Sequence, residues 1–203
     1  MTAYIKPVFH VFLMIFYFKR TKRFNVLLLF TFACGMLGEF LIAKGFLENF
    51  KIVSLFFTSF FIGLTILLIP IIRVTPFRFW RHSVGQVIIG VVGLIAILLS
   101  TYFLTSEYLP EYGYNVMFLT SIAFFLASCF YVSFFSKHPN SFYLFIVGAA
   151  YLIDFACSIL HQTVLPYQLL LGLANTSEII AQYFFVLFLA QISLKSNYEE
   201  LPM

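Results

Sequence analysis

The sequence predicts an all-α fold: a polytopic bundle of about seven membrane-spanning helices that forms one domain over residues 1–203. Hydrophobic residues make up 62% of the chain and charged residues only 10%, too few polar side chains to cover a soluble domain. The apolar residues gather in runs about as long as a bilayer is thick, separated by charged or Pro- and Gly-containing loops. We therefore expect a single transmembrane helical domain whose solvent is lipid.

Seven apolar runs follow one another, at approximately residues 4–18, 24–43, 50–72, 84–104, 113–136, 141–161 and 167–194. The first run covers only about 22 Å at helical rise, so it needs a locally thinner bilayer or burial among its neighbours. It ends in Lys-Arg, without a small-residue cleavage site, so we expect a retained span and no removable signal peptide. The last run either begins with a turn near Pro166 or is a helix broken around Gly172, which would give eight helices.

Positive charges concentrate in alternate loops, which predicts the orientation of the chain. By the positive-inside rule these loops are cytoplasmic, so we expect the N-terminus outside and the C-terminus inside. The expected location is the cell (inner) membrane. The cations that carry this prediction are Lys19, Arg20, Lys22, Arg23, Arg73, Arg78, Arg81, Lys137 and Lys195. Because they lie in short loops, the net charge of +4 does not indicate binding to nucleic acid.

No cofactor or metal site is expected. Cys34, Cys129 and Cys157 all fall inside apolar runs, so they are predicted to be small buried side chains, and no Cys/His pair has zinc-ligand spacing. Gly35 and Gly38 are predicted to allow close packing of helices. The oligomeric state stays open.

Three of the apolar runs contain a carboxylate, namely Glu39, Asp154 and Glu178. A charge at bilayer depth costs roughly 2.5–3.5 kcal/mol on insertion scales, so it tends to persist where it is used or paired. All three lie roughly 20–24 Å from the predicted cytoplasmic ends, toward the outer leaflet. Like charges in one low-dielectric site cannot all ionise, so one carboxyl is expected to keep a proton and to be available as a general acid.

Neighbouring polar residues leave a packing explanation open for each carboxylate. Tyr151, Asp154 and Ser158 share one face of their helix, so Asp154 could simply bond across helices through these partners. Glu39 could pair with Lys44. Glu178 could bond Asn175 and Gln182, which lie on its own face.

The order of these features resembles the lysoplasmalogenase (YhhN-like) family of multi-pass membrane proteins. That family is marked by an early Lys-Pro, a Gly-Asp in a following span, a Ser-Asp in a late span, where this chain has Ile153 in place of the Ser, and an Ala-Gln in the last span. The matching stretches are Lys6-Pro7, Gly38-Glu39, Asp154 within GAAYLIDFACSIL, and Ala181-Gln182 within IIAQYFFVLFLA. Glu39 stands where the family has Asp.

The resemblance implies a membrane-embedded hydrolase that cleaves the vinyl-ether bond of a lysophospholipid with paired carboxylates and water. Glu39 and Asp154 would be the catalytic pair, one as proton donor and the other as the ionised partner, in an order that stays open. The expected substrate-binding residues are Lys6, Tyr151, Ser158, Glu178 and Gln182. Two other classes explain the same spans: a non-catalytic lipid-binding or structural membrane protein, and a small transporter that uses intramembrane acids.

Overall fold

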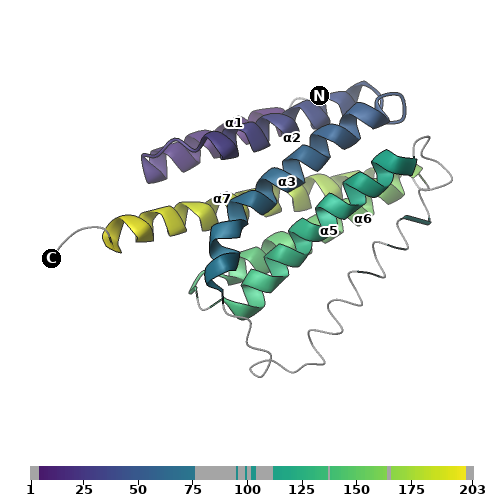
Figure 1. Cartoon of the computed structure of the whole chain (residues 1–203). Helices are drawn as coiled ribbons and strands as arrows, with labels where there is room; N and C mark the ends of the chain where they lie inside the picture. The colour runs from purple at the N-terminus through teal and green to yellow at the C-terminus, as the bar shows by residue number, and fades with distance from the viewer. Residues whose placement is uncertain are drawn as a thin grey trace.

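A computed structural model describes residues 5–75, 112–136, 138–163 and 166–199, with the isolated positions 95, 99, 102 and 103. Its described part contains helices and no strand (Figure 1). The six described helices are α1 (Ile5–Thr21), α2 (Val26–Lys44), α3 (Phe50–Val74), α5 (Tyr112–Phe135), α6 (Phe142–Thr163) and α7 (Gln168–Glu199). The prediction of an all-helical chain holds for all of these residues.

Five of these helices are long and apolar enough to cross a membrane, so the chain is a multi-pass membrane protein. They are Val26–Lys44, Phe50–Val74, Tyr112–Phe135, Phe142–Gln162 and Gln168–Leu194. Helix α1, with 17 residues, is the shortest of the six, as expected from the first apolar run. The run expected at 84–104 lies outside the described residues apart from its isolated positions, so seven spans remain a prediction.

The last apolar run forms one continuous helix, α7, which does not break at Gly172. The chain turns before it: the backbone N–H of Leu170 donates to the carbonyl oxygen of Tyr167 as the helix begins. Of the two alternatives for this run, the turn near Pro166 is therefore correct and the eighth helix is wrong. A Cβ at Gly172 would meet no atom within 4 Å, so this glycine is not placed there by crowding.

Local chemistry sets the two ends of α2. The side chain of Asn25 caps the helix by accepting from the backbone N–H of Leu28 at 3.0 Å. At the other end Gly45 adopts φ 138°, a conformation that strains residues with a Cβ, and its N–H donates to the carbonyl oxygen of Ile42. The short turn after Gly45 returns the chain antiparallel into α3.

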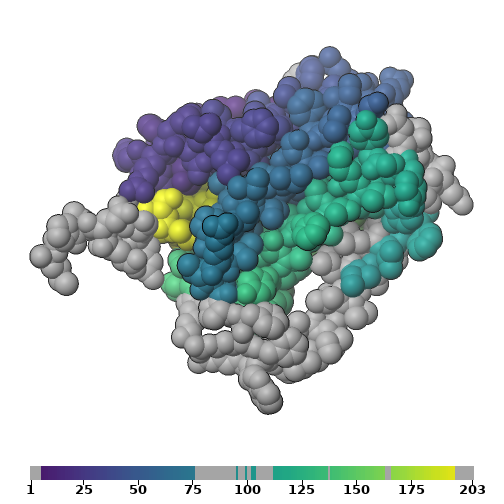
Figure 2. All heavy atoms as spheres, viewed as in Figure 1, coloured from purple at the N-terminus to yellow at the C-terminus, as the bar shows by residue number. Residues whose placement is uncertain are grey.

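The described helices pack as a closed ring. Each packs against the next in chain order, and α1 also packs against α7, which closes the ring. In the space-filling view, α2, α3 and α5 lie side by side across one face (Figure 2). Rings of phenylalanine fill the interior, including Phe32, Phe60, Phe125 and Phe185, whereas many other apolar side chains face outward as in a lipid-facing surface.

Small residues let α2 and α3 approach closely. A Cβ on Gly38 would lie 2.8 Å from the ring of Phe57, and one on Gly63 would overlap the side chain of Thr31. A Cβ on Gly35 would lie 3.0 Å from both His10 and Phe60. The close-packing role predicted for Gly35 and Gly38 is thus confirmed, and it positions Glu39 against the inside of the ring.

Candidate functional site

A cavity of about 130 Å³ lies inside the ring, toward the end where α2 joins α3 and α6 joins α7. We call this end the α2–α3 end. All six described helices contribute residues to the wall of the cavity. The lining residues on which the site depends are Lys6, Glu39, Tyr151, Asp154, Ser158 and Glu178, with phenylalanines 46, 50, 57, 60, 61, 118 and 155.

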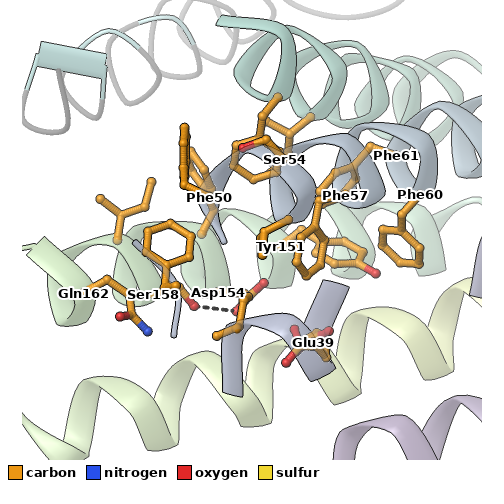
Figure 3. Close-up of a pocket in the computed structure, with 18 of the residues that line it drawn as sticks. Glu39, Phe50, Ser54, Phe57, Phe60, Phe61, Tyr151, Asp154, Ser158 and Gln162 are labelled. Atoms are coloured by element: carbon orange, nitrogen blue, oxygen red, sulfur yellow. Dashed lines mark hydrogen bonds between the residues drawn. The ribbon is translucent and has the colours of Figure 1, made fainter. Parts of the chain in front are cut away.

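The cavity has an aromatic wall and a polar wall. Helix α3 supplies much of the aromatic wall, because Phe50, Phe57 and Phe61 recur at spacings of seven and four residues and so lie on one face. Figure 3 shows these rings on one side, with Asp154 and Glu39 on the other. An apolar chain fits the first wall, and a polar group fits the second.

Lys6 joins three helices through the polar wall. Its Nζ lies 3.1 Å from Oε2 of Glu39 on α2 and 2.5 Å from Oε2 of Glu178 on α7. The three side chains are largely buried, with exposed fractions of 18% for Lys6, 11% for Glu39 and 7% for Glu178. Since a lone buried charge is costly, the two ion pairs explain how α1 holds an ammonium group at this depth.

Asp154 is the third carboxyl of the polar wall, and its environment differs. Its Oδ1 accepts a hydrogen bond from Ser158 Oγ at 3.2 Å, one helical turn away on α6 (Figure 3). Among the described residues no cation forms an ion pair with it. Glu39 and Glu178 therefore share the ammonium, while Asp154 faces the cavity with a neutral partner.

Below the carboxyls lies a second polar group. The amide nitrogen of Gln182 donates to Oε1 of Glu178 at 2.8 Å, both side chains being on α7. Within the described part of the chain, the Tyr151 hydroxyl and the Gln182 amide oxygen have no hydrogen-bond partner, although both residues are only 2% exposed. Buried polar atoms are rarely left unpaired, so this part of the site is suited to a ligand or a water molecule.

The structure brings together every residue that the sequence singled out for the site. Six of the seven line the cavity, and Gln182 reaches it through its bond to Glu178. Two of the hydrogen bonds that the packing explanation predicted are present: Asp154 accepts one from Ser158, and Glu178 accepts one from Gln182. The suggested pair of Glu39 with Lys44 is wrong, since Glu39 binds Lys6 and the Lys44 ammonium lies 4.5 Å from the centre of the Phe40 ring.

Sequence reasoning missed other polar residues of the cavity, among them Ser54, Asn115 and Gln162. Asn115 carried a usable signal, because an amide inside an apolar run is as unusual as a carboxylate. His10 is buried one turn from Lys6 and donates from Nδ1 to the Lys6 carbonyl oxygen at 2.9 Å. Its Nε2 accepts or donates no hydrogen bond among the residues that the structure describes, and its ring packs edge-on against Phe32.

Within the described ranges, no three His, Cys, Asp or Glu side chains are arranged to hold a metal ion. The polar wall offers one ammonium group, three carboxyls, the hydroxyls of Tyr151 and Ser158 and the amide of Gln182, around a space large enough for several water molecules. Carboxyls in such a setting serve general acid and base catalysis. No family model, curated protein or solved structure matches the chain.

Proposed function

We propose that this protein is a membrane-embedded hydrolase that cleaves the vinyl-ether bond of a lysophospholipid. The observation that carries the proposal is the meeting of Glu39, Asp154 and Glu178, from three helices, at the polar end of a cavity walled by phenylalanine. The resemblance of the sequence to the lysoplasmalogenase (YhhN-like) family supports it, because that family's acids correspond to Glu39 and Asp154. The apolar chain of the lipid would lie along the aromatic wall.

Asp154 is the proton donor in this proposal. Ionising all three carboxyls beside one ammonium would leave excess negative charge in a low-dielectric space, and Asp154 is the one of the three that forms no ion pair with a described residue. It transfers its proton to the vinyl carbon farther from the ether oxygen. The double bond is consumed, and the carbon bonded to oxygen becomes an oxocarbenium ion.

Water completes the reaction. A water molecule adds to the oxocarbenium carbon, and a carboxylate, Asp154 itself or Glu39, accepts the proton that this water loses. The resulting hemiacetal then breaks its bond to the headgroup oxygen, which takes up a proton, to give a fatty aldehyde and a glycerophospho-alcohol. One water is consumed, and no electrons are exchanged with a cofactor.

Lys6, together with Glu178 and Gln182 of α7, would position the reacting carboxyls. Lys6 holds Glu39 and Glu178 at the cavity through its two ion pairs, and Gln182 holds Glu178 in place by its hydrogen bond. The negative charge gathered here would stabilise the oxocarbenium ion, which is the main electrostatic demand of this chemistry. Tyr151 and Ser158 would contact the substrate from α6.

A second candidate function is lipid binding without chemistry. Its supporting observation is that Lys6, Glu39 and Glu178 are already paired and link α1, α2 and α7, as purely structural polar groups do. A small transporter is the third class, and it has less support because transporters usually contain broken helices, whereas α7 is continuous.

The test is aldehyde release from a vinyl-ether lysophospholipid by purified protein in detergent. Wild type is compared with Asp154→Asn and Glu39→Gln, and with Glu48→Gln as the matched control, since Glu48 is an exposed carboxylate at the α2–α3 end that does not line the cavity. We expect the first two changes to lower the rate at least about 100-fold, as loss of a general acid does, and the control to be unaffected.

Two results would contradict the proposal. Activity that survives both Asp154→Asn and Glu39→Gln would place catalysis elsewhere in the protein. Absence of aldehyde from wild type, over several headgroups and a range of pH, would favour the lipid-binding alternative. Thermal unfolding of each variant distinguishes a lost catalytic group from a lost fold.

A further inference from the structure

The cavity has more acidic than basic groups. Three carboxyls face it, Glu39, Asp154 and Glu178, and among the described lining residues Lys6 is the cation. The other polar lining side chains, such as Ser54 and Asn115, carry no charge. A positively charged ligand group would therefore restore the balance of charge, and an anionic one would disturb it further.

Two polar groups beside this cluster have hydrogen-bonding capacity that no described residue uses. Tyr151 lines the cavity and is 2% exposed, and no described residue forms a hydrogen bond with its hydroxyl oxygen. Asp154 on the next turn of the same helix receives one hydrogen bond, from Ser158, and forms no ion pair with a described residue. An ammonium group has only donors, so it complements both positions.

The opposite wall also suits a cation with an apolar tail. Phe57, Phe118 and Phe155 form a continuous aromatic group, with ring centroids 6.2 Å apart for Phe57 and Phe118 and 5.8 Å apart for Phe118 and Phe155. All three line the cavity. Aromatic faces attract ammonium ions, most strongly where water is excluded, and they also accommodate an alkyl chain.

We infer that the cavity is a binding site for single-chain ammonium amphiphiles, with the ammonium group beside Asp154 and Tyr151 and the chain along the phenylalanine wall. The inference deepens the proposed function and in part rests on it: the oxocarbenium ion formed on the lipid chain is itself a cation beside Asp154. An alkylammonium ion has the same charge next to the same kind of chain, so it imitates that state, which an enzyme binds more tightly than its substrate.

The experiment measures binding without turnover. Protein in phosphatidylcholine vesicles is equilibrated with radiolabelled decylammonium, decanol or decanoate, which share one chain and differ in head charge, and partition into empty vesicles is subtracted. We expect saturable binding of decylammonium, roughly tenfold or more tighter than that of decanol, with decanoate the weakest. Aldehyde release is measured separately on the same samples.

Variants locate the site. Asp154→Asn should weaken decylammonium binding at least about tenfold and leave decanol binding unchanged, which also reports an intact fold. Phe118→Leu, which keeps an apolar side chain but loses the ring, should weaken binding of the cation more than binding of the alcohol. Glu48→Gln removes the same charge outside the cavity and should change neither.

The outcomes separate this inference from the proposed function. Equal binding of decylammonium and decanol, or equal losses in Asp154→Asn and Glu48→Gln, would overturn the inference even in a protein that releases aldehyde. A tenfold preference for decylammonium that depends on Asp154 would support the inference. If the same protein releases no aldehyde, the cavity is an ammonium-binding site and the proposed hydrolase is excluded.

Discussion

The ammonium group of Lys6 lies 2.5 Å from Oε2 of Glu178, and this ion pair joins the first helix of the ring to the last. The same ammonium binds Glu39 on α2 at 3.1 Å. Helix α1 packs against α2 and α7, so Lys6 holds together the three helices that meet on this side of the cavity. A single side chain thus connects the closure of the fold to the arrangement of the carboxyls.

Replacing Lys6 should destabilise the protein strongly. In Lys6→Met, Glu39 and Glu178 lose their shared cation while still largely buried, and breaking a buried ion pair costs about 3–5 kcal/mol. We expect a loss of about 3 kcal/mol, since Lys6 keeps some exposure to water. The measurement is the free energy of unfolding in a denaturing detergent.

Lys19→Met is the control for this prediction, because Lys19 is an exposed lysine at the other end of the same helix. It should change the free energy of unfolding by less than about 0.5 kcal/mol. If Lys6→Met were as stable as Lys19→Met, the ion pairs at Lys6 would contribute nothing to the closure of the ring.

The helices could be predicted from the sequence because a bilayer admits few backbone structures and demands long apolar runs. The six runs that fall on described residues became helices whose ends lie within a few residues of those expected, apart from the longer C-terminal end of α7. The carboxylates could be identified for the same reason, since a charge at membrane depth is rare. Residue spacing then grouped Tyr151 with Asp154 on one helix, and Glu178 with Gln182 on another.

Contacts between helices could not be predicted in this way. Glu39 was paired with Lys44 because they are close in sequence, but Lys44 lies on another side of α2 and the true partner is Lys6 of α1. Which face of one helix meets which face of another depends on packing, here on Gly38 and Phe57, and not on local spacing. Asn115 was missed because amides were considered only where they share a helix face with a carboxylate, and the helix of Asn115 has no carboxylate in its apolar run.

Gly38→Ala should destabilise the α2–α3 contact and disturb the site. The new Cβ would lie 2.8 Å from the Phe57 ring, so the ring or the helix must move, and overpacking of this kind costs about 1–3 kcal/mol. Because Glu39 follows Gly38, we expect aldehyde release to fall as well. The free energy of unfolding and the rate are measured together.

Gly172→Ala is the matched control, since a Cβ at this helical glycine meets nothing within 4 Å. It should leave stability unchanged or raise it by up to about 1 kcal/mol, as expected for alanine in a helix. Combining Gly38→Ala with Phe57→Leu should recover part of the stability that Gly38→Ala loses, because leucine is smaller than phenylalanine and leaves room for the new Cβ. Equal effects of Gly38→Ala and Gly172→Ala would show that α2 and α3 are not in close contact at this point.

Tyr151→Phe should separate ligand binding from stability. The hydroxyl of Tyr151 forms no hydrogen bond with the described residues, so its removal should cost less than about 0.5 kcal/mol in free energy of unfolding. If the hydroxyl contacts the substrate, KM should rise about fivefold, which corresponds to one hydrogen bond of about 1 kcal/mol. Steady-state kinetics and unfolding on one preparation provide both numbers.

Tyr17→Phe is the comparison for Tyr151→Phe. Tyr17 is also a buried tyrosine, but its hydroxyl bonds Ser193 Oγ at 3.1 Å, far from the cavity. This change should lower stability by about 1 kcal/mol and leave KM unchanged. The reverse pattern, with the larger stability loss in Tyr151→Phe, would mean that the Tyr151 hydroxyl serves packing and not the ligand.

The orientation in the membrane determines which leaflet can supply the cavity. The positive-inside rule predicts that the α2–α3 end faces outward, so a cysteine at Glu48 should react with a membrane-impermeant maleimide in intact cells. A cysteine at Lys19, near the opposite end of α1, should react only after the cells are permeabilised. Both changes are made in a chain whose native cysteines 34, 129 and 157 are replaced by alanine.

The labelling result shows from which leaflet the cavity takes its substrate. If Glu48→Cys is labelled first, the α2–α3 end faces outward, so a lysolipid enters the cavity from the outer leaflet. If Lys19→Cys is labelled first, the orientation prediction is wrong and the same cavity draws substrate from the cytoplasmic leaflet. The arrangement of Asp154, Glu39 and Glu178 around Lys6 is the same in both cases, so the labelling decides the source of the substrate and leaves the catalytic test independent.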